Sequence, residues 1–162
     1  MRGVRIGHEH HAPLLAMLGD PRVGATMGGT RSAEEVTAVI DRHVAGWETD
    51  GFHYWIFLDR ETGEAIARGG LSRTSVTGRD EVEVGWVVVP DRWGQSYATE
   101  LGAAALDVAF GPIALDTVIS YTLPENAASR RVMEKLGFSY EREIVHYDLP
   151  HVLYRVQPPD SR

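Results

Sequence analysis

Residues 81–122 read as a strand, a helix and a second strand, and this order restricts the fold more than any other feature. The segment opens with EVEVGWVVV, where an alternating start gives way to continuous apolar residues, as in a strand that becomes buried. Small and apolar residues then recur at helical spacing over residues 98–109, and Gly111-Pro112 ends that helix. Residues 117–122 form a β-branched strand. Because such units pair their strands in parallel with a right-handed crossover, we expect an α/β fold with one parallel strand pair.

The rest of the chain predicts a mixed, mostly antiparallel sheet flanked by helices, in one domain over residues 1–162. The helix after Ser32 is marked by a capping box with Glu35, in which each side chain meets the other residue's amide. No internal repeat or linker is present. The expected helices are 12–18, 33–47 and 126–136, and the expected strands are 52–58, 64–71, 138–145 and 152–156, with a loop at 24–30 and a closing turn at 148–150.

Composition narrows the possible functions. The net charge of −7 argues against a nucleic-acid binder, which needs a basic face, and it is compatible with cationic substrates such as amines. No apolar run approaches the roughly 20 residues that a membrane-spanning helix needs, and the N-terminus has no signal-peptide core. The chain has no cysteine, so thiolate sites are excluded. We expect a cytoplasmic protein.

The loop DRWGQSYATE lies between a buried strand and a helix, which is a favourable place for an anion. First-turn amides of a helix have no partner within the helix, and the helix dipole favours negative charge there. Neither a G-x-G-x-x-G nor a G-x-x-x-x-G-K-[ST] motif is present. By itself, the loop is also consistent with an ordinary turn between a strand and a helix.

Together, EVGWVVVPDRWGQSYATE and LPENAASRRVMEKLGF resemble the GNAT superfamily of N-acetyltransferases, and within it the ribosomal-protein N-terminal acetyltransferase-like branch. The resemblance extends from about residue 12 to residue 156 and includes TGEAIARGGL. It implies the acyl-CoA N-acyltransferase fold, with a splayed parallel strand pair. It also implies direct transfer of acetyl from acetyl-CoA to a primary amine, on a protein N-terminus or a small molecule.

The resemblance also implies which residues bind coenzyme A. Asn126 is expected to contact the cofactor through its side chain. Ser96 stands where the family has glycine; if its backbone is helical, serine costs little and its hydroxyl can donate to a phosphate. The backbone of Trp86, Val87 and Val88 would pair with the pantetheine arm, and the amides of Gly94, Gln95, Ser96, Tyr97, Ala98 and Thr99 would hold the pyrophosphate.

Two catalytic residues follow from the same resemblance. Many relatives carry a tyrosine where this chain has Met133, which cannot donate a proton, so Ser129 is expected to protonate the departing thiolate. Glu83 shares a strand face with Glu81 and is expected to assist deprotonation of the amine. A strand amide near Val88 would meet the oxyanion. The alternatives are that the glutamates are solvated at a strand end and that Ser129 belongs to a helix cap.

Other possibilities remain open at this stage. Ser96 and Met133 also fit a non-catalytic acyl-CoA-binding regulatory module. We expect no metal site at His8, His10 and His11, which lack a shared helical face. A homodimer is possible, and either the first strand is short in this chain or the true start lies upstream. Residues 53–55 and 146–148 contribute either to the acceptor pocket or, respectively, to the core and to a solvated turn.

Overall fold

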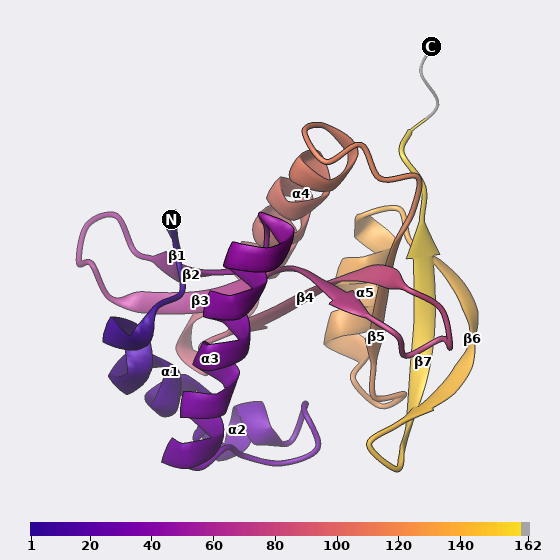
Figure 1. Ribbon diagram of the computed structural model, residues 1–162. Coiled ribbons are helices and arrows are strands. Elements are labelled where there is room, and N and C mark those ends of the chain that lie inside the picture. The colour runs from indigo at the N-terminus through magenta and orange to yellow at the C-terminus, as the bar shows by residue number, and fades with distance from the viewer. Residues whose placement is uncertain (160–162) are drawn as a thin grey trace.

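The computed structural model describes residues 1–159, which form a seven-stranded sheet with helices on both faces (Figure 1). The strand order is β1-β2-β3-β4-β5-β7-β6, and β4–β5 is its parallel pair among antiparallel ones. No helix within the described residues is long and apolar enough to cross a membrane. The strands are β1 (Arg2–Arg5), β2 (Tyr54–Leu58), β3 (Ala65–Thr74), β4 (Glu81–Val88), β5 (Val118–Thr122), β6 (Ser139–His146) and β7 (Leu149–Val156), and the helices are η1 (His8–His10), α1 (His11–Leu18), α2 (Pro21–Gly24), α3 (Ala33–Asp50), η2 (Pro90–Arg92), α4 (Tyr97–Phe110) and α5 (Ala127–Lys135).

The parallel pair is splayed, as expected. β4 pairs with β3 along its whole length, from Glu81 to Val88. Its register with β5 consists of a single Cα pair, Glu83 with Ile119. Figure 1 shows β4 running away from β5 beyond this point, toward the half of the sheet that holds β1 to β3. The sheet therefore consists of two halves with a gap between them.

Alternation along the strands distributes the core over the two faces of the sheet. In β2, Ile56 packs in the cluster that includes α1 and α3, whereas its neighbour Phe57 packs with Leu101 of α4. In β4, Val82 and Val84 face α4 and α5 in a third cluster. Consequently the intervening residues of β4, including Glu83, face the side of the sheet that carries α3.

Local signals explain where most elements begin. The capping box at α3 is present: Glu35 N donates to Ser32 Oγ at 3.3 Å and Ser32 N donates to Glu35 Oε2 at 2.8 Å. The helix continues three residues beyond the expected end, to Asp50, and Gly51 terminates it with a φ of 74°. The predicted boundaries of α1, β2, β4 and β5 agree with the structure to within two residues.

Two local predictions were wrong. The expected loop at 24–30 begins one residue too early, because residues 21–24 form the short helix α2: Asp20 accepts from Arg22 N and Pro21 fits the first helical turn. The last hairpin turns at Tyr147 and Asp148, with φ values of 48° and 59°, so β7 already begins at Leu149. Two residues in left-handed conformation make the tight turn that hairpins prefer.

Candidate active site

The anion loop leaves β4 through η2 and enters α4 at Tyr97. Ser96 is the N-cap residue of α4, and its carbonyl accepts from Glu100 N at 2.9 Å. The first-turn amides, from Tyr97 to Thr99, therefore have no partner within the helix. Residues 93–96 are exposed, so the amides of the whole loop can meet an anion from solvent.

Ser96 does not have helical backbone angles. Its φ is 64° and its ψ is 7°, in the left-handed region that favours glycine. The expectation that serine is nearly without cost here was therefore wrong: a residue with a Cβ loses about 1–2 kcal/mol in this conformation. The Ser96 side chain makes no capping hydrogen bond. Its hydroxyl thus remains available to a ligand.

The edge of β4 that faces the gap carries the backbone groups of alternate residues. The Val84 carbonyl accepts from Ser120 Oγ at 2.9 Å and so points toward β5. Alternation places the groups of Trp86 and Val88 on that same side and those of Val87 toward β3. The Val88 carbonyl is occupied, because Trp93 Nε1 donates to it at 2.8 Å. Of the three residues expected to pair with pantetheine, Trp86 and Val88 thus present free groups to the gap.

A cavity of about 780 Å³ lies beside this gap, between α3 and the tip of the β6–β7 hairpin. It brings together Glu83 from β4 with Asn126 and Ser129 from the start of α5, together with Trp86 and Val87. The pyrophosphate-loop residues 94–99 are not among those that line it. The site therefore has two parts, a loop that suits an anion and a cavity that holds the predicted catalytic side chains.

Glu83 is half-buried in the cavity wall. Its Oε1 accepts from Ser72 Oγ at 2.9 Å. Burial raises the pKa of the Glu83 carboxyl, against the opposing effect of hydrogen bonds from Tyr121 and Ser72. A carboxylate with a raised pKa is a better proton acceptor than a solvated one, so Glu83 has the properties of a general base.

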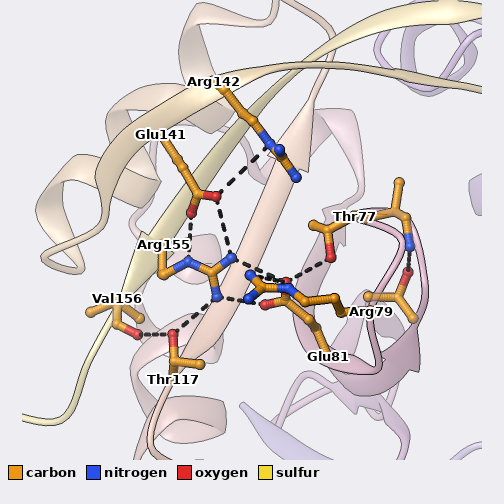
Figure 2. A network of polar contacts seen from close by, with 10 residues as sticks. Thr77, Arg79, Glu81, Thr117, Glu141, Arg142, Arg155 and Val156 are labelled. Atoms are coloured by element: carbon orange, nitrogen blue, oxygen red, sulfur yellow. Dashed lines mark hydrogen bonds and ion pairs between the residues drawn. The ribbon is translucent and has the colours of Figure 1, made fainter.

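Glu81 has different surroundings, although it shares the strand face (Figure 2). Arg155 Nη2 donates to its Oε1 at 3.1 Å, and Thr77 Oγ1 donates to the same atom at 2.7 Å. These hydrogen bonds, Arg155 first, lower the pKa of the Glu81 carboxyl despite its burial. Its side chain is 6% exposed, so the alternative of a solvated carboxylate is wrong for Glu81. Glu81 is part of an ion-pair network that joins β4 to β7.

Asn126 and Ser129 lie at the start of α5, as expected. Asn126 Oδ1 accepts from Ser129 N at 3.1 Å, and Asn126 Nδ2 donates to Thr122 Oγ1 at 3.1 Å. Asn126 thus caps the helix with its amide oxygen and links this cap to β5 with its amide nitrogen. Ser129 contributes its backbone to the cap while lining the cavity. Met133, at the position of the usual tyrosine, is buried in the core.

Sequence reasoning missed a polar cluster on the opposite wall of the cavity. Arg68 Nη1 donates to His43 Nε2 at 3.0 Å, and His43 Nδ1 lies 2.8 Å from His53 Nδ1. Burial, followed by the nearby Arg68, lowers the pKa of His43 to about 2, so its ring is neutral. His43 Nε2 accepts, which leaves Nδ1 to donate to His53. The arginine inside the apolar stretch AIARGGL was the available sequence signal.

Aromatic side chains form the wall nearest the final hairpin. The Tyr121 ring lies 5.1 Å from that of His146 and 5.8 Å from that of His151. Tyr147 and Tyr54 also line the cavity. The sequence left the surroundings of residues 53–55 and 146–148 undecided. Residues 53, 54, 146 and 147 line the cavity. Trp55 packs against the core cluster of β2, β3 and α4, and Asp148 is exposed at the turn.

Comparison with known proteins gives one family. Residues 4–139 match the model of the acetyltransferase (GNAT) domain. An uncharacterized protein of Bacillus subtilis, YkkB, is 27% identical over 144 residues, which cover 88% of this chain and 84% of YkkB.

Two solved structures share the fold. The ribosomal-protein-S5-alanine acetyltransferase from Vibrio fischeri has a TM-score of 0.77 and 16% identity, and covers 99% of this chain and 94% of that one. The aminoglycoside acetyltransferase AAC(6')-Ib in complex with coenzyme A also has a TM-score of 0.77 and 16% identity, over 96% and 94% of the two chains. The family match over most of the chain, on a sheet with this splayed pair, shows that the protein belongs to the GNAT family of acetyl-CoA-dependent N-acetyltransferases.

Proposed function

We propose that this enzyme moves acetyl directly from acetyl-CoA to a primary amine held in the cavity, with Glu83 as base and Ser129 as acid. One observation carries the proposal: Glu83 and Ser129 come from different elements yet line the same cavity, beside the gap in the sheet. The amine nitrogen attacks the thioester carbon, its proton passes to Glu83, and the C–S bond breaks as Ser129 gives a proton to the thiolate.

The gap supports a place for the cofactor. A pantetheine arm carries amide groups, and an extended arm between β4 and β5 would pair with the free backbone groups of Trp86 and with Val88 N. The same Val88 amide would meet the oxyanion of the tetrahedral intermediate. The amides of residues 94–99 would hold the pyrophosphate, with Asn126 bordering the arm from α5. This arrangement assigns a role to each predicted cofactor residue except the backbone of Val87.

The chemical identity of the acceptor is a separate question from the type of reaction. The two structural relatives act on a ribosomal protein and on aminoglycosides, and they resemble this chain equally. Fold similarity therefore does not select between a protein N-terminus and a small molecule, or place the chain in the ribosomal-protein branch. What supports an amine acceptor is the carboxylate of Glu83, which faces the cavity with a raised pKa.

Binding and turnover test the proposal separately. Millimolar acetyl-CoA should raise the melting temperature, because a ligand that binds only the folded state stabilises it by mass action. Thiol release with a panel of N-terminal peptides, amino acids, polyamines and aminoglycosides then identifies the acceptor. Binding without thiol release from any amine would favour the non-catalytic module, and no thermal shift would contradict the whole proposal.

We also propose a homodimer as the assembly. Its support is limited to exposed apolar side chains: Trp93 is 48% exposed, and Tyr140 and Val145 on β6 are exposed as well. β6 is the edge strand of the sheet, so a second copy can approach it. Light scattering measures the assembly, and a monomeric mass contradicts this proposal alone.

A further inference from the structure

Arg68 of β3 carries a buried charge. The residue is 7% exposed, and its side chain lies on the α3 side of the sheet, where its guanidinium carbon is 5.5 Å from the centre of the Tyr54 ring. Nη1 donates to His43, whereas the buried Nε has no hydrogen-bond partner in the part of the chain that the structure describes. Burying a charge is costly unless it is paired.

The guanidinium has no counter-ion in the described protein. None of the ion pairs between residues 1 and 159 involves Arg68. His43, its hydrogen-bond partner, is a neutral ring and cannot balance the charge. Glu83 lines the same cavity without forming an ion pair with Arg68. Glu83 and Arg68 attract each other electrostatically without a direct ion pair, so the buried positive charge is compensated only in part.

Neighbouring side chains make this end of the cavity positive. Arg31 and Arg42 also line it, together with the carboxylate of Glu35, and after burial itself the two arginines are the groups that lower the pKa of Arg68. A fourth arginine, Arg73, is paired with Asp50 at 2.9 Å. The net charge of the chain is −7, so this local excess of positive charge is opposite in sign to the protein as a whole. An anion, and not a polycation, matches such a surface.

We propose that the acetyl acceptor carries a carboxylate as well as its primary amine, and that Arg68 binds this carboxylate while the amine lies at Glu83. The inference rests on the proposed function and names its substrate class. The Arg68 guanidinium has one positive charge and no ion-pair partner, so it matches one carboxylate. A guanidinium pairs with a carboxylate through two parallel hydrogen bonds. It also refines the interpretation of the net charge, which was compatible with cationic amines, because the acceptor now carries a negative group beside its amine.

Matched pairs of amines test this assignment. Binding of amino acids and of their C-terminal amides to the protein saturated with coenzyme A is measured by calorimetry, which does not require turnover. The free acid should bind about 10- to 100-fold more tightly than its amide, the range for a hydrogen-bonded charge. The amide has the less basic amine, so more of it is in the reactive neutral form. If kcat/KM is nevertheless higher for the free acid than for its amide, amine basicity cannot be the cause.

Three variants separate the role of Arg68 from a general charge effect. Arg68→Gln removes the charge but keeps a donor for His43, and the preference for the free acid should disappear. Arg68→Lys keeps the charge without the planar fork and should retain part of the preference. Arg60→Met removes an equal charge from an exposed loop and should retain all of it. Because Arg68→Gln removes a buried charge that has no ion-pair partner, the melting temperature of this variant without ligand should equal or exceed that of the wild type.

Each result bears on one proposal or the other. Equal binding of acid and amide, or a preference that survives in Arg68→Gln, overturns the inference while leaving acetyl transfer to neutral amines intact. Tighter binding of a phosphate-bearing amine than of any carboxylate overturns the choice of anion. Failure of acetyl-CoA to bind overturns the proposed function itself, and the calorimetric comparison of acid and amide on the protein without cofactor then decides whether Arg68 binds a carboxylate.

Discussion

Glu81 and Glu83 are two residues apart on one face of β4, and their carboxyl pKa values are shifted in opposite directions. Arg155 stabilises the charge on Glu81, and burial disfavours the charge on Glu83. The first group is therefore ionised throughout the neutral range and committed to a structural contact. The second can exchange a proton, which is the property that acid–base chemistry requires.

Replacing Glu83 with Gln should lower kcat/KM by about 10²-fold, within the usual range for one general base. The deficit should shrink as the pH approaches the pKa of the amine, because solvent then supplies the neutral nucleophile. In the wild type, kcat/KM should fall as the pH drops through the raised pKa of Glu83. pH–rate profiles measure both effects. A wild-type profile in Glu83→Gln would exclude Glu83 from the mechanism and leave water as the base.

The same two glutamates should differ in their effect on stability. A carboxyl group whose pKa is raised in the folded state stabilises the fold at pH values below its unfolded-state pKa. This stabilisation is lost as the pH rises through the folded-state pKa. Glu83→Gln should therefore raise the melting temperature at neutral pH, with no gain at acid pH. Glu81→Gln should lower the melting temperature, through a loss of about 1–3 kcal/mol in the free energy of unfolding. This loss should vanish as the pH falls through the lowered pKa of Glu81. Thermal melts from acid to neutral pH provide the comparison.

Ser129→Ala should reduce kcat by about 10²-fold at every pH, because protonation of the thiolate is lost whatever the state of the amine. The cap of α5 should survive, since Ser129 donates to Asn126 through its backbone amide. Asn126→Ala is the contrasting variant, and it should cost about 1 kcal/mol of stability. Steady-state kinetics with melting curves separate the two. A fall in stability of Ser129→Ala equal to that of Asn126→Ala would point to a structural role.

Ser96→Gly should relieve the left-handed backbone and raise the free energy of unfolding by up to about 1 kcal/mol. Acetyl-CoA affinity should be unchanged or improved. Ser96→Ala keeps the strained backbone without the hydroxyl, so it isolates the hydroxyl's contribution to phosphate binding. Calorimetric titration with acetyl-CoA distinguishes the cases: a large loss of affinity in both variants would show that the hydroxyl outweighs the strain.

The sequence predicted the parts of the structure that local chemistry determines. The α3 capping box, the strand–helix–strand unit and the splayed pair follow from residue patterns and from the family resemblance. The fold class and the family membership were both confirmed. The left-handed Ser96 was not predicted, because a serine at a helix start normally has extended angles. The signal that could have found it is the glycine that the family carries at this position, since glycine favours positive φ.

The polar cluster of His43, His53 and Arg68 was not predicted from the sequence for a different reason. His43 lies on α3, His53 directly before β2 and Arg68 on β3, and only the tertiary packing of the helix on the sheet joins them. Considered one at a time in the sequence, each is an ordinary polar residue. Likewise, the pairing of Glu81 with Arg155 spans 74 positions, so no local pattern distinguishes Glu81 from Glu83.

The backbone register of β4 with β5 consists of a single residue pair, and this has a consequence for how the protein unfolds. Elsewhere in the sheet, neighbouring strands are held by extended ladders, so strands β1–β4 and strands β5–β7 each form a block with its own hydrogen bonds. Without ligand, we expect amides on either side of the gap to exchange with solvent through local opening. With acetyl-CoA bound between the two blocks, the amides on both sides of the gap should exchange as one cooperative unit. The substrate would then also stabilise the sheet against local opening.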